Sequence, residues 1–271
     1  MSKTNPIGVF DSGIGGLSVL KQFLRFLPYE KYIYLGDTAR VPYGNKSPET
    51  VIEYSLEASR FLISKDVKLI VIACNTASSV ALDIVREAVD IPVIGMIYPA
   101  AQAALRASAS GNIGIIGTRA TIASKAYESA LNKLSENRTL KVFSQACPLF
   151  VPIVEEGWLR HQATRIIAEE YLASLIDKNI DTLVLGCTHY PLLSQIISEI
   201  MPGITLIDSG EHASVNAVRV LGESGMLADE REEYNFTPET DFYVTDIHST
   251  FYEVAQRFLG FNVDSPKKII L

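Results

Sequence analysis

The sequence predicts an α/β protein made of two similar, doubly wound parallel-sheet domains related by a pseudo-twofold axis, with its functional site in the interdomain cleft. Short apolar runs rich in β-branched residues alternate with longer amphipathic segments, and one strand–turn–helix pattern occurs twice. Such alternation is typical of parallel sheets covered by helices on both faces. With 271 residues, of which 48% are hydrophobic, the chain can bury one large core or two modest ones.

The predicted strands are short apolar runs, at residues 7–10, 32–35, 69–73, 113–116, 140–143, 183–185 and 205–207. Helix-start signals lie between them, and the clearest is Ser47 followed by Pro48 and Glu49. A serine cap, a proline in the first turn and an acid at the positive end of the helix dipole predict a helix over residues 48–64. No Gly/Ser-rich or Pro-rich linker interrupts the chain, so any two domains must pack closely together.

The internal repeat involves two pairs of segments. Residues 8–12 and 114–118 each run from a strand into a small polar turn, and so do residues 71–76 and 184–189. A duplication would place equivalent strand ends opposite each other across a cleft. The alternative is a coincidence between common strand–turn–helix units, and the sequence leaves it open.

Composition argues against several classes of protein. The net charge of −7 disfavours a nucleic-acid partner, because such partners usually require a clustered basic face. The N-terminus has no apolar core of signal-peptide length, and no later run has the length of a membrane span, so we expect a soluble cytoplasmic enzyme with no membrane contact. The acidic cluster Asp229, Glu230, Glu232 and Glu233 is interpreted as solvated surface.

Two of the three cysteines stand in matching positions. Their wide spacing suits neither a disulfide framework nor a metal site, so any role rests on the thiols themselves. Cys74 and Cys187 each follow an apolar strand run, where ligands of open parallel sheets bind, and each precedes residues that can start a helix. Such a helix end attracts carboxylates and lowers the pKa of a thiol. A single cysteine there would more often be a buried hydrophobe. Cys147 precedes Pro148 with no polar helix start after it, and we interpret it as a core or loop residue.

Two opposed thiols suit the inversion of a stereocentre, which requires a base on one face of the carbon and an acid on the other. Asp11, at the end of the first strand, is predicted to assist Cys74, and His189 is predicted to assist Cys187. Each has a structural alternative, because an Asp before Ser-Gly is often a turn former, and a histidine in a Thr-His-Tyr-Pro turn can serve packing alone.

The glycines of residues 11–16 invite a dinucleotide interpretation. The third glycine of that motif would fall at position 18, which is Ser18, so we predict instead a tight loop whose backbone approaches a small anion. The polar loop at residues 41–46 is predicted to line the cleft, with an ordinary turn as the alternative.

Four segments together resemble glutamate racemases. They are Phe-Asp-Ser-Gly-Ile-Gly-Gly at 10–16, Arg-Val-Pro-Tyr-Gly-Asn-Lys-Ser at 40–47, Ala-Cys-Asn-Thr-Ala-Ser at 73–78 and Gly-Cys-Thr-His-Tyr-Pro at 186–191. The resemblance extends from about residue 7 to about residue 260, in order and at the expected spacing, and is therefore more specific than any one motif.

The resemblance implies interconversion of L- and D-glutamate without pyridoxal phosphate, metal or other cofactor, supplying D-glutamate for bacterial peptidoglycan. It implies Cys74 and Cys187 as the acid/base thiols, Asp11 and His189 as assisting groups, and Glu155 as a further acid near His189. The implied substrate-binding residues are Asp11, Ser12, Tyr43, Gly44, Asn75, Thr76, Thr118, Thr121, Thr188 and His189.

The resemblance also implies domains at residues 1–97 plus 208–271 and at residues 98–207, and a homodimer. By analogy Cys74 serves the D-substrate and Cys187 the L-substrate, although the sequence alone does not assign them. The alternatives are a two-thiol racemase acting on aspartate or hydantoins, a non-catalytic binding protein for a small anion, and a thiol redox protein. The last is disfavoured because Cys74 and Cys187 lack CxxC spacing.

Overall fold

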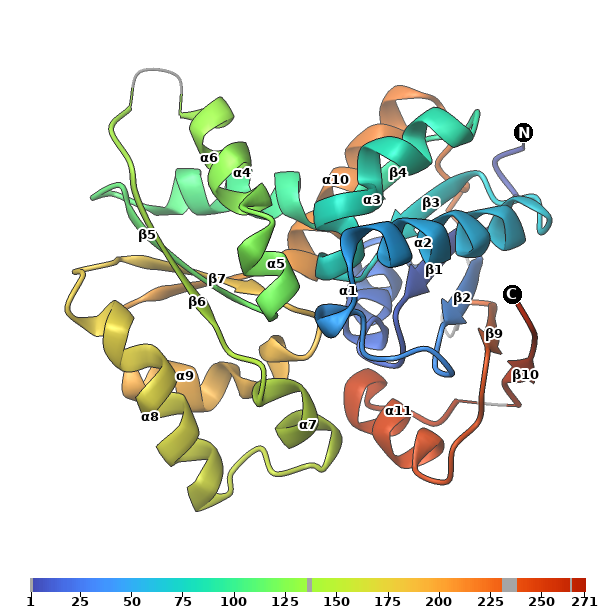
Figure 1. The fold of residues 1–271 in the computed structure, drawn as a ribbon. Coiled ribbons are helices and arrows are strands. Elements are labelled where there is room, and N and C mark those ends of the chain that lie inside the picture. The colour runs from blue at the N-terminus through green and yellow to red at the C-terminus, as the bar shows by residue number, and fades with distance from the viewer. Residues whose placement is uncertain (1, 136–137, 231–237, 264) are drawn as a thin grey trace.

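The computed structural model describes residues 2–135, 138–230, 238–263 and 265–271, and its strands there form two parallel sheets (Figure 1). The first sheet has the order β10-β9-β2-β1-β3-β4, and the second has the order β6-β5-β7-β8. The strands of the first sheet are β1 (Ile7–Asp11), β2 (Tyr32–Gly36), β3 (Leu69–Ile72), β4 (Val93–Gly95), β9 (Thr240–Val244) and β10 (Lys267–Lys268). Those of the second are β5 (Asn112–Gly117), β6 (Lys141–Ala146), β7 (Thr182–Gly186) and β8 (Thr205–Asp208).

The predicted duplication is confirmed by topology and register. The order β2-β1-β3-β4 in the first sheet is repeated as β6-β5-β7-β8 in the second. Val9 pairs with Val71 between β1 and β3, and Ile115 pairs with Val184 between β5 and β7. Cys74 lies three residues after Val71, and Cys187 lies three residues after Val184. The two thiols therefore occupy equivalent positions in the two halves.

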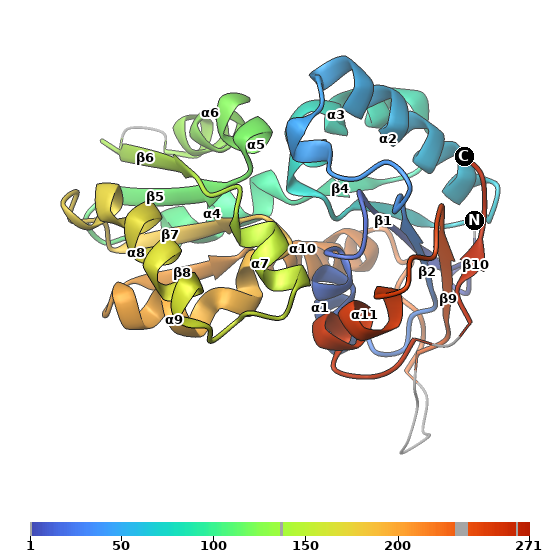
Figure 2. The ribbon, with the colours of Figure 1, turned by 60° about the horizontal axis from the view of Figure 1, so that its bottom comes forward.

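Helices cover both faces of each sheet, as Figures 1 and 2 show. Parallel strands need such cover because both of their faces are apolar, and β1, β2, β3 and β7 are buried throughout. The helices of the first half are α1 (Leu17–Phe26), α2 (Pro48–Ile63), α3 (Asn75–Ala88), α10 (Ser209–Glu223) and α11 (Phe251–Leu259), with the 3₁₀ turn η1 (Tyr43–Asn45). Those that follow β4 are α4 (Ile97–Ala107), α5 (Arg119–Ala123), α6 (Ala126–Leu134), α7 (Phe150–Glu155), α8 (Gln162–Ile176) and α9 (Ser194–Ile200), with the 3₁₀ turn η2 (Tyr190–Leu193).

The two halves pack closely, as we predicted because the sequence has no Gly/Ser-rich or Pro-rich linker. One cluster of buried side chains joins Leu17 of α1, Tyr190 of η2 and Phe258 of α11. Helix α2 starts as predicted, because the Ser47 hydroxyl accepts a hydrogen bond from the Thr50 amide and Pro48 is its first residue.

Some strand predictions were incomplete. Strands β4, β9 and β10 were missed, and β6 extends to Ala146 rather than ending at 143. No α-helix begins directly after Cys187, because Pro191 lies in the 3₁₀ turn η2 and α9 starts only at Ser194.

Two remaining sequence expectations concern the surface. Asp229 and Glu230 are exposed as predicted, whereas Glu232 and Glu233 lie outside the described residues. Across the described part of the chain, every helix is too short or too polar to cross a bilayer.

Candidate active site

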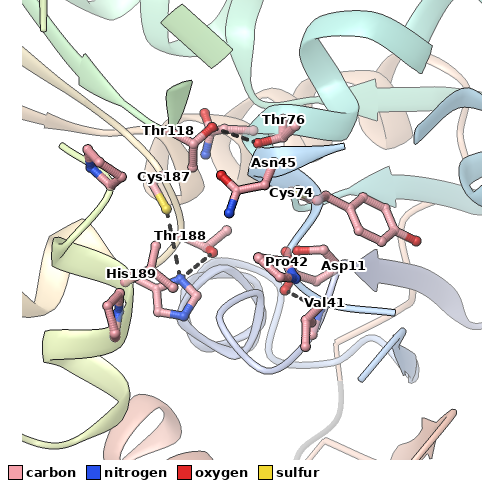
Figure 3. A pocket seen from close by; sticks show the side chains of 18 of the residues that line it. Asp11, Val41, Pro42, Asn45, Cys74, Thr76, Thr118, Cys187, Thr188 and His189 are labelled. Carbon is pink, nitrogen blue, oxygen red and sulfur yellow. Dashed lines mark hydrogen bonds between the residues drawn. The ribbon is translucent and has the colours of Figure 1, made fainter. Parts of the chain in front are cut away.

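A cavity of about 420 Å³ lies at the carboxyl ends of the strands, between the two halves (Figure 3). Cys74 and Asp11 lie on one side of it, and Cys187, Thr188 and His189 lie on the other. Of the residues predicted for the site, all except Thr121 line it: Asp11, Ser12, Tyr43, Gly44, Cys74, Asn75, Thr76, Thr118, Glu155, Cys187, Thr188 and His189. Its volume is typical of pockets that bind small molecules.

Cys74 is the N-cap residue of α3. Its sulfur accepts a weak hydrogen bond from the Ala77 amide, 3.5 Å away, and the side chain is almost fully buried. Burial and the negative charge of Asp11 raise the pKa of this thiol to about 12, and hydrogen bonds from Ser12 and Ala77 offset this only in part. The expected lowering of the pKa by the helix end is therefore wrong for Cys74, because desolvation outweighs the helix dipole.

Cys187 has a different set of neighbours. Its sulfur lies 3.8 Å from Nδ1 of His189, and Nε2 of the same ring lies 2.9 Å from Oε1 of Glu155. Burial lowers the pKa of His189, but its contacts with Cys187 and Glu155 outweigh that effect and raise the pKa to about 10. At that pKa the imidazole is cationic at neutral pH, and it lies between the sulfur of Cys187 and the carboxylate of Glu155.

Asp11 ends β1 beside Cys74. Its Oδ2 accepts a hydrogen bond from the Gly13 amide, whereas its buried Oδ1 has no partner among the described residues. Burial raises the pKa of this carboxyl, although nearby amides and His189 act in the opposite direction. An unpaired buried carboxylate oxygen at a cavity wall is an acceptor for a ligand donor, because leaving it unpaired is costly.

The glycine-rich loop after Asp11 is explained by close packing. A Cβ at Gly15 would lie 2.3 Å from the His189 ring, and a Cβ at Gly16 would lie 2.4 Å from Cβ of Asp11. The loop thus lets His189 of the second half approach the backbone of the first half.

Three threonine hydroxyls meet across the boundary between the halves. Oγ1 of Thr76 lies 2.9 Å from that of Thr118 and 3.2 Å from that of Thr121, and Thr118 and Thr121 are 2.9 Å apart. Thr121 is buried behind the other two and does not line the cavity. Its hydroxyl supports Thr118 rather than facing a ligand directly.

The other predicted binding residues are held by partners outside the cavity. Asn75 accepts a hydrogen bond from the Tyr127 hydroxyl at 2.7 Å, Tyr43 donates to Asp37 at 2.5 Å, and the Thr188 carbonyl accepts from Ser18 at 2.6 Å. Gly44 approaches the second half so closely that an added Cβ would lie 3.0 Å from Thr118.

Sequence reasoning missed two parts of the wall. Arg119, the first residue of α5, lines the cavity and is exposed, and its position directly after Thr118 could have identified it. The apolar side chains Pro148, Leu149, Val151 and Pro152 also line the cavity, whereas Glu155 was the only residue of this segment predicted to belong to the site. Within the described residues, no group of three or more His, Cys, Asp or Glu side chains could hold a metal ion.

The unequal neighbours of the two thiols predict unequal reactivity. Iodoacetamide should label Cys187 before Cys74 between about pH 7 and 9. The thiolate is the nucleophile, and burial together with Asp11 raises the pKa of Cys74, whereas Cys187 lies 3.8 Å from the cationic ring of His189. Peptide mass spectrometry after short exposures measures both sites in one sample. Equal labelling, or labelling of Cys74 first, would contradict this assignment of the environments.

The sequence is similar to those of known racemases. The profile of the Asp/Glu/Hydantoin racemase family matches residues 7–217. The chain is 47% identical over 255 residues to the glutamate racemase of Geobacter metallireducens, covering 94% of this chain and 92% of that protein. It is 49% identical over 265 residues to the glutamate racemase of Chlorobaculum tepidum, covering 96% and 94% respectively.

The fold is also similar to those of solved racemase structures. The glutamate racemase of Francisella tularensis in complex with D-glutamate superposes with a TM-score of 0.91 at 40% identity, covering 99% of this chain and 98% of that one. An aspartate racemase homologue from Pyrococcus horikoshii shares the fold alone, with a TM-score of 0.59 at 19% identity. On this sequence and fold similarity, the chain belongs to the Asp/Glu/Hydantoin racemase family.

Proposed function

We propose that this protein interconverts L- and D-glutamate without a cofactor, using Cys74 and Cys187 as its two acid/base groups. The observation that carries the proposal is the placement of the two thiols at equivalent ends of β3 and β7, both lining one cavity. They are close enough that a charge on Cys187 raises the pKa of Cys74. The substrate is inferred from the relatives named glutamate racemase.

Glutamate binds as the zwitterion. Backbone amides and the hydroxyls of Ser12, Thr76, Thr118 and Thr188 hold its carboxylates, since a wall of hydroxyl and N–H donors suits anions. The unpaired Oδ1 of Asp11 accepts from the substrate ammonium group. Because the charge of Asp11 raises the pKa of Cys74, a bound ammonium offsets that charge and favours the Cys74 thiolate.

The reaction needs one proton removed and one delivered. The thiolate on one face takes the α-proton and becomes a thiol, the electron pair stays on the α-carbon, and the opposite thiol gives its proton to the other face. Each turnover therefore leaves the protonation states of the two cysteines exchanged. The carbanion is stabilised by preorganised donors and by exclusion of water from the cavity.

The test is α-proton exchange of L-glutamate in deuterium oxide with the purified protein and no added cofactor, followed by circular dichroism. We expect the signal to fall to zero together with deuterium incorporation at the α-carbon. Turnover of aspartate or a hydantoin instead would move the protein to another substrate within the family. Binding of glutamate with no exchange would favour a non-catalytic anion-binding protein and contradict the two-thiol reaction.

Three further parts of this proposal concern the setting of the enzyme. We propose that it acts in the cytoplasm, supplies D-glutamate for peptidoglycan and forms a homodimer, as the resemblance to glutamate racemases implies. Light scattering should then give twice the mass of the 29.8 kDa chain, and depletion in the native host should be rescued by D-glutamate. A monomer in solution, or failure of rescue, would contradict the respective part.

A further inference from the structure

An arginine of α11 reaches across the boundary between the halves to the end of α7. Helix α11 packs against α1 of the first half, and its side chains Phe251, Val254 and Phe258 are buried in the shared core cluster. Figure 2 shows α11 beside α7. The Arg257 guanidinium donates to the carbonyls of Val154 and Glu155 and also pairs with Glu253 one turn earlier on its own helix. Its side chain is only 18% exposed.

The end of α7 is shaped to receive this cation. The Gly157 amide donates to the Val154 carbonyl and the Trp158 amide donates to the Ile153 carbonyl, which is the Schellman arrangement with a left-handed residue, here Gly157 with φ of 74°. A Cβ at Gly157 would lie 2.6 Å from the guanidinium. The cation therefore occupies the space that a side chain would fill, at the negative end of the α7 dipole.

The carbonyl that Arg257 binds belongs to the residue that orients His189. Oε1 of Glu155 lies 2.9 Å from Nε2 of His189, whose other nitrogen faces Cys187. The Glu155 side chain is 44% exposed, so burial alone does not fix it. Helix α11 also touches the His189 ring directly, since Phe258 meets it edge-on at 5.1 Å.

We propose that Arg257 is a positioning residue, which locks the Glu155 backbone from the opposite half and thereby aligns Glu155, His189 and Cys187 for proton transfer. The inference rests on the proposed racemase function. The proposed effect concerns Cys187. Among the described residues, the hydrogen bonds at Asp11 and Cys74 include those from the backbone amides of Gly13 and Ala77, which lie in the same half as Cys74.

The structure offers two independent ways to remove the contact. Arg257→Ala deletes the guanidinium, and Gly157→Ala displaces it with a methyl group. Each variant should lower kcat about tenfold to a hundredfold, because a shift of about 1 Å in a catalytic group has effects of that order. KM should change less, since Arg257 does not line the cavity. Combining the two changes should cost no more than the larger single effect, because both break one contact.

Matched controls separate positioning from general damage. Arg219→Ala removes an arginine that pairs with Glu223 four residues away on α10, without any contact to α7. Gly225→Ala puts the same strain on the same Schellman arrangement at the end of α10, where φ is 67° and nothing lies within 4 Å of an added Cβ. Both controls should keep wild-type kcat, and Arg257→Lys should recover part of it.

A deuterium isotope effect tests the link to Cys187. Arg257→Ala should slow only the proton transfers made by Cys187. The kinetic isotope effect of α-deuteration should then rise for the enantiomer whose α-hydrogen Cys187 removes, and it should fall for the other enantiomer. If Arg257 only stabilised the fold, the isotope effects of the two enantiomers would change in the same direction. Wild-type kcat in Arg257→Ala and Gly157→Ala, or parallel isotope effects, would overturn the inference, whereas an inactive wild-type protein would instead refute the proposed function.

Discussion

The Cys74→Ser and Cys187→Ser variants are each expected to lose glutamate racemisation by at least about a thousandfold, since general acid–base groups contribute effects of that order. Every turnover uses both thiols, one to take a proton and one to give it. A serine hydroxyl at either position is far less acidic and supplies no base near neutral pH. Circular dichroism with each enantiomer measures the loss directly.

The matched control is Cys147→Ser. Cys147 is fully buried but does not line the cavity, and its sulfur lies 3.7 Å from the Gln145 carbonyl, where a serine hydroxyl can still donate. This variant should racemise glutamate at nearly the wild-type rate. Near-normal racemisation by Cys74→Ser or Cys187→Ser would refute the two-thiol mechanism.

A substrate with a leaving group identifies the face that each thiol serves. With chloride on the β-carbon of glutamate, one thiolate removes the α-proton, chloride leaves, and the enamine hydrolyses to the oxo acid and ammonium. This path needs only one base, so Cys74→Ser and Cys187→Ser should each retain it with one enantiomer, and with opposite enantiomers. Chloride release is the measurement, and the same preference in both variants would contradict opposed faces.

The fold could largely be predicted because buried parallel strands are nearly continuous apolar runs. Strand β4 escaped prediction because it has only three residues. Strand β9, Thr240–Val244, was missed because its place beside β2 depends on contacts between residues about two hundred positions apart. Local periodicity carries no information about such a partner.

The candidate site was predicted from strand ends and motifs, while its electrostatics were not. A helix start after Cys74 suggested a lowered pKa, but the result depends on how deeply the sulfur is buried and on Asp11, which only the folded chain brings near. No sequence pattern identified Arg257 as a functional residue either. It lies on an ordinary amphipathic helix, and its contact with Glu155 spans about a hundred residues.

His189→Gln is expected to slow racemisation by about a hundredfold to a thousandfold, because glutamine can hold a hydrogen bond but cannot carry the charge beside Cys187. A second measurement is needed that reports the charge of the His189 imidazole directly. Contacts with Cys187 and Glu155 raise the pKa of His189 from 6.5 to about 10 in the folded protein.

The raised pKa predicts how stability changes with pH. Below pH 6.5 the imidazole is protonated in both the folded and the unfolded chain, and its contribution to stability is fully present. Between 6.5 and about 10 only the folded state keeps the proton, so stability falls as pH rises. The wild-type melting temperature should therefore fall more steeply than that of His189→Gln across this window.

His212→Gln is the matched control for this measurement. His212 lies on α10 outside the cavity, and partial burial lowers its pKa below the ordinary 6.5, so above that pH it is neutral whether folded or unfolded. Its removal should leave the slope unchanged. Parallel melting curves for the wild type and His189→Gln would show that His189 is not held as a cation beside Cys187.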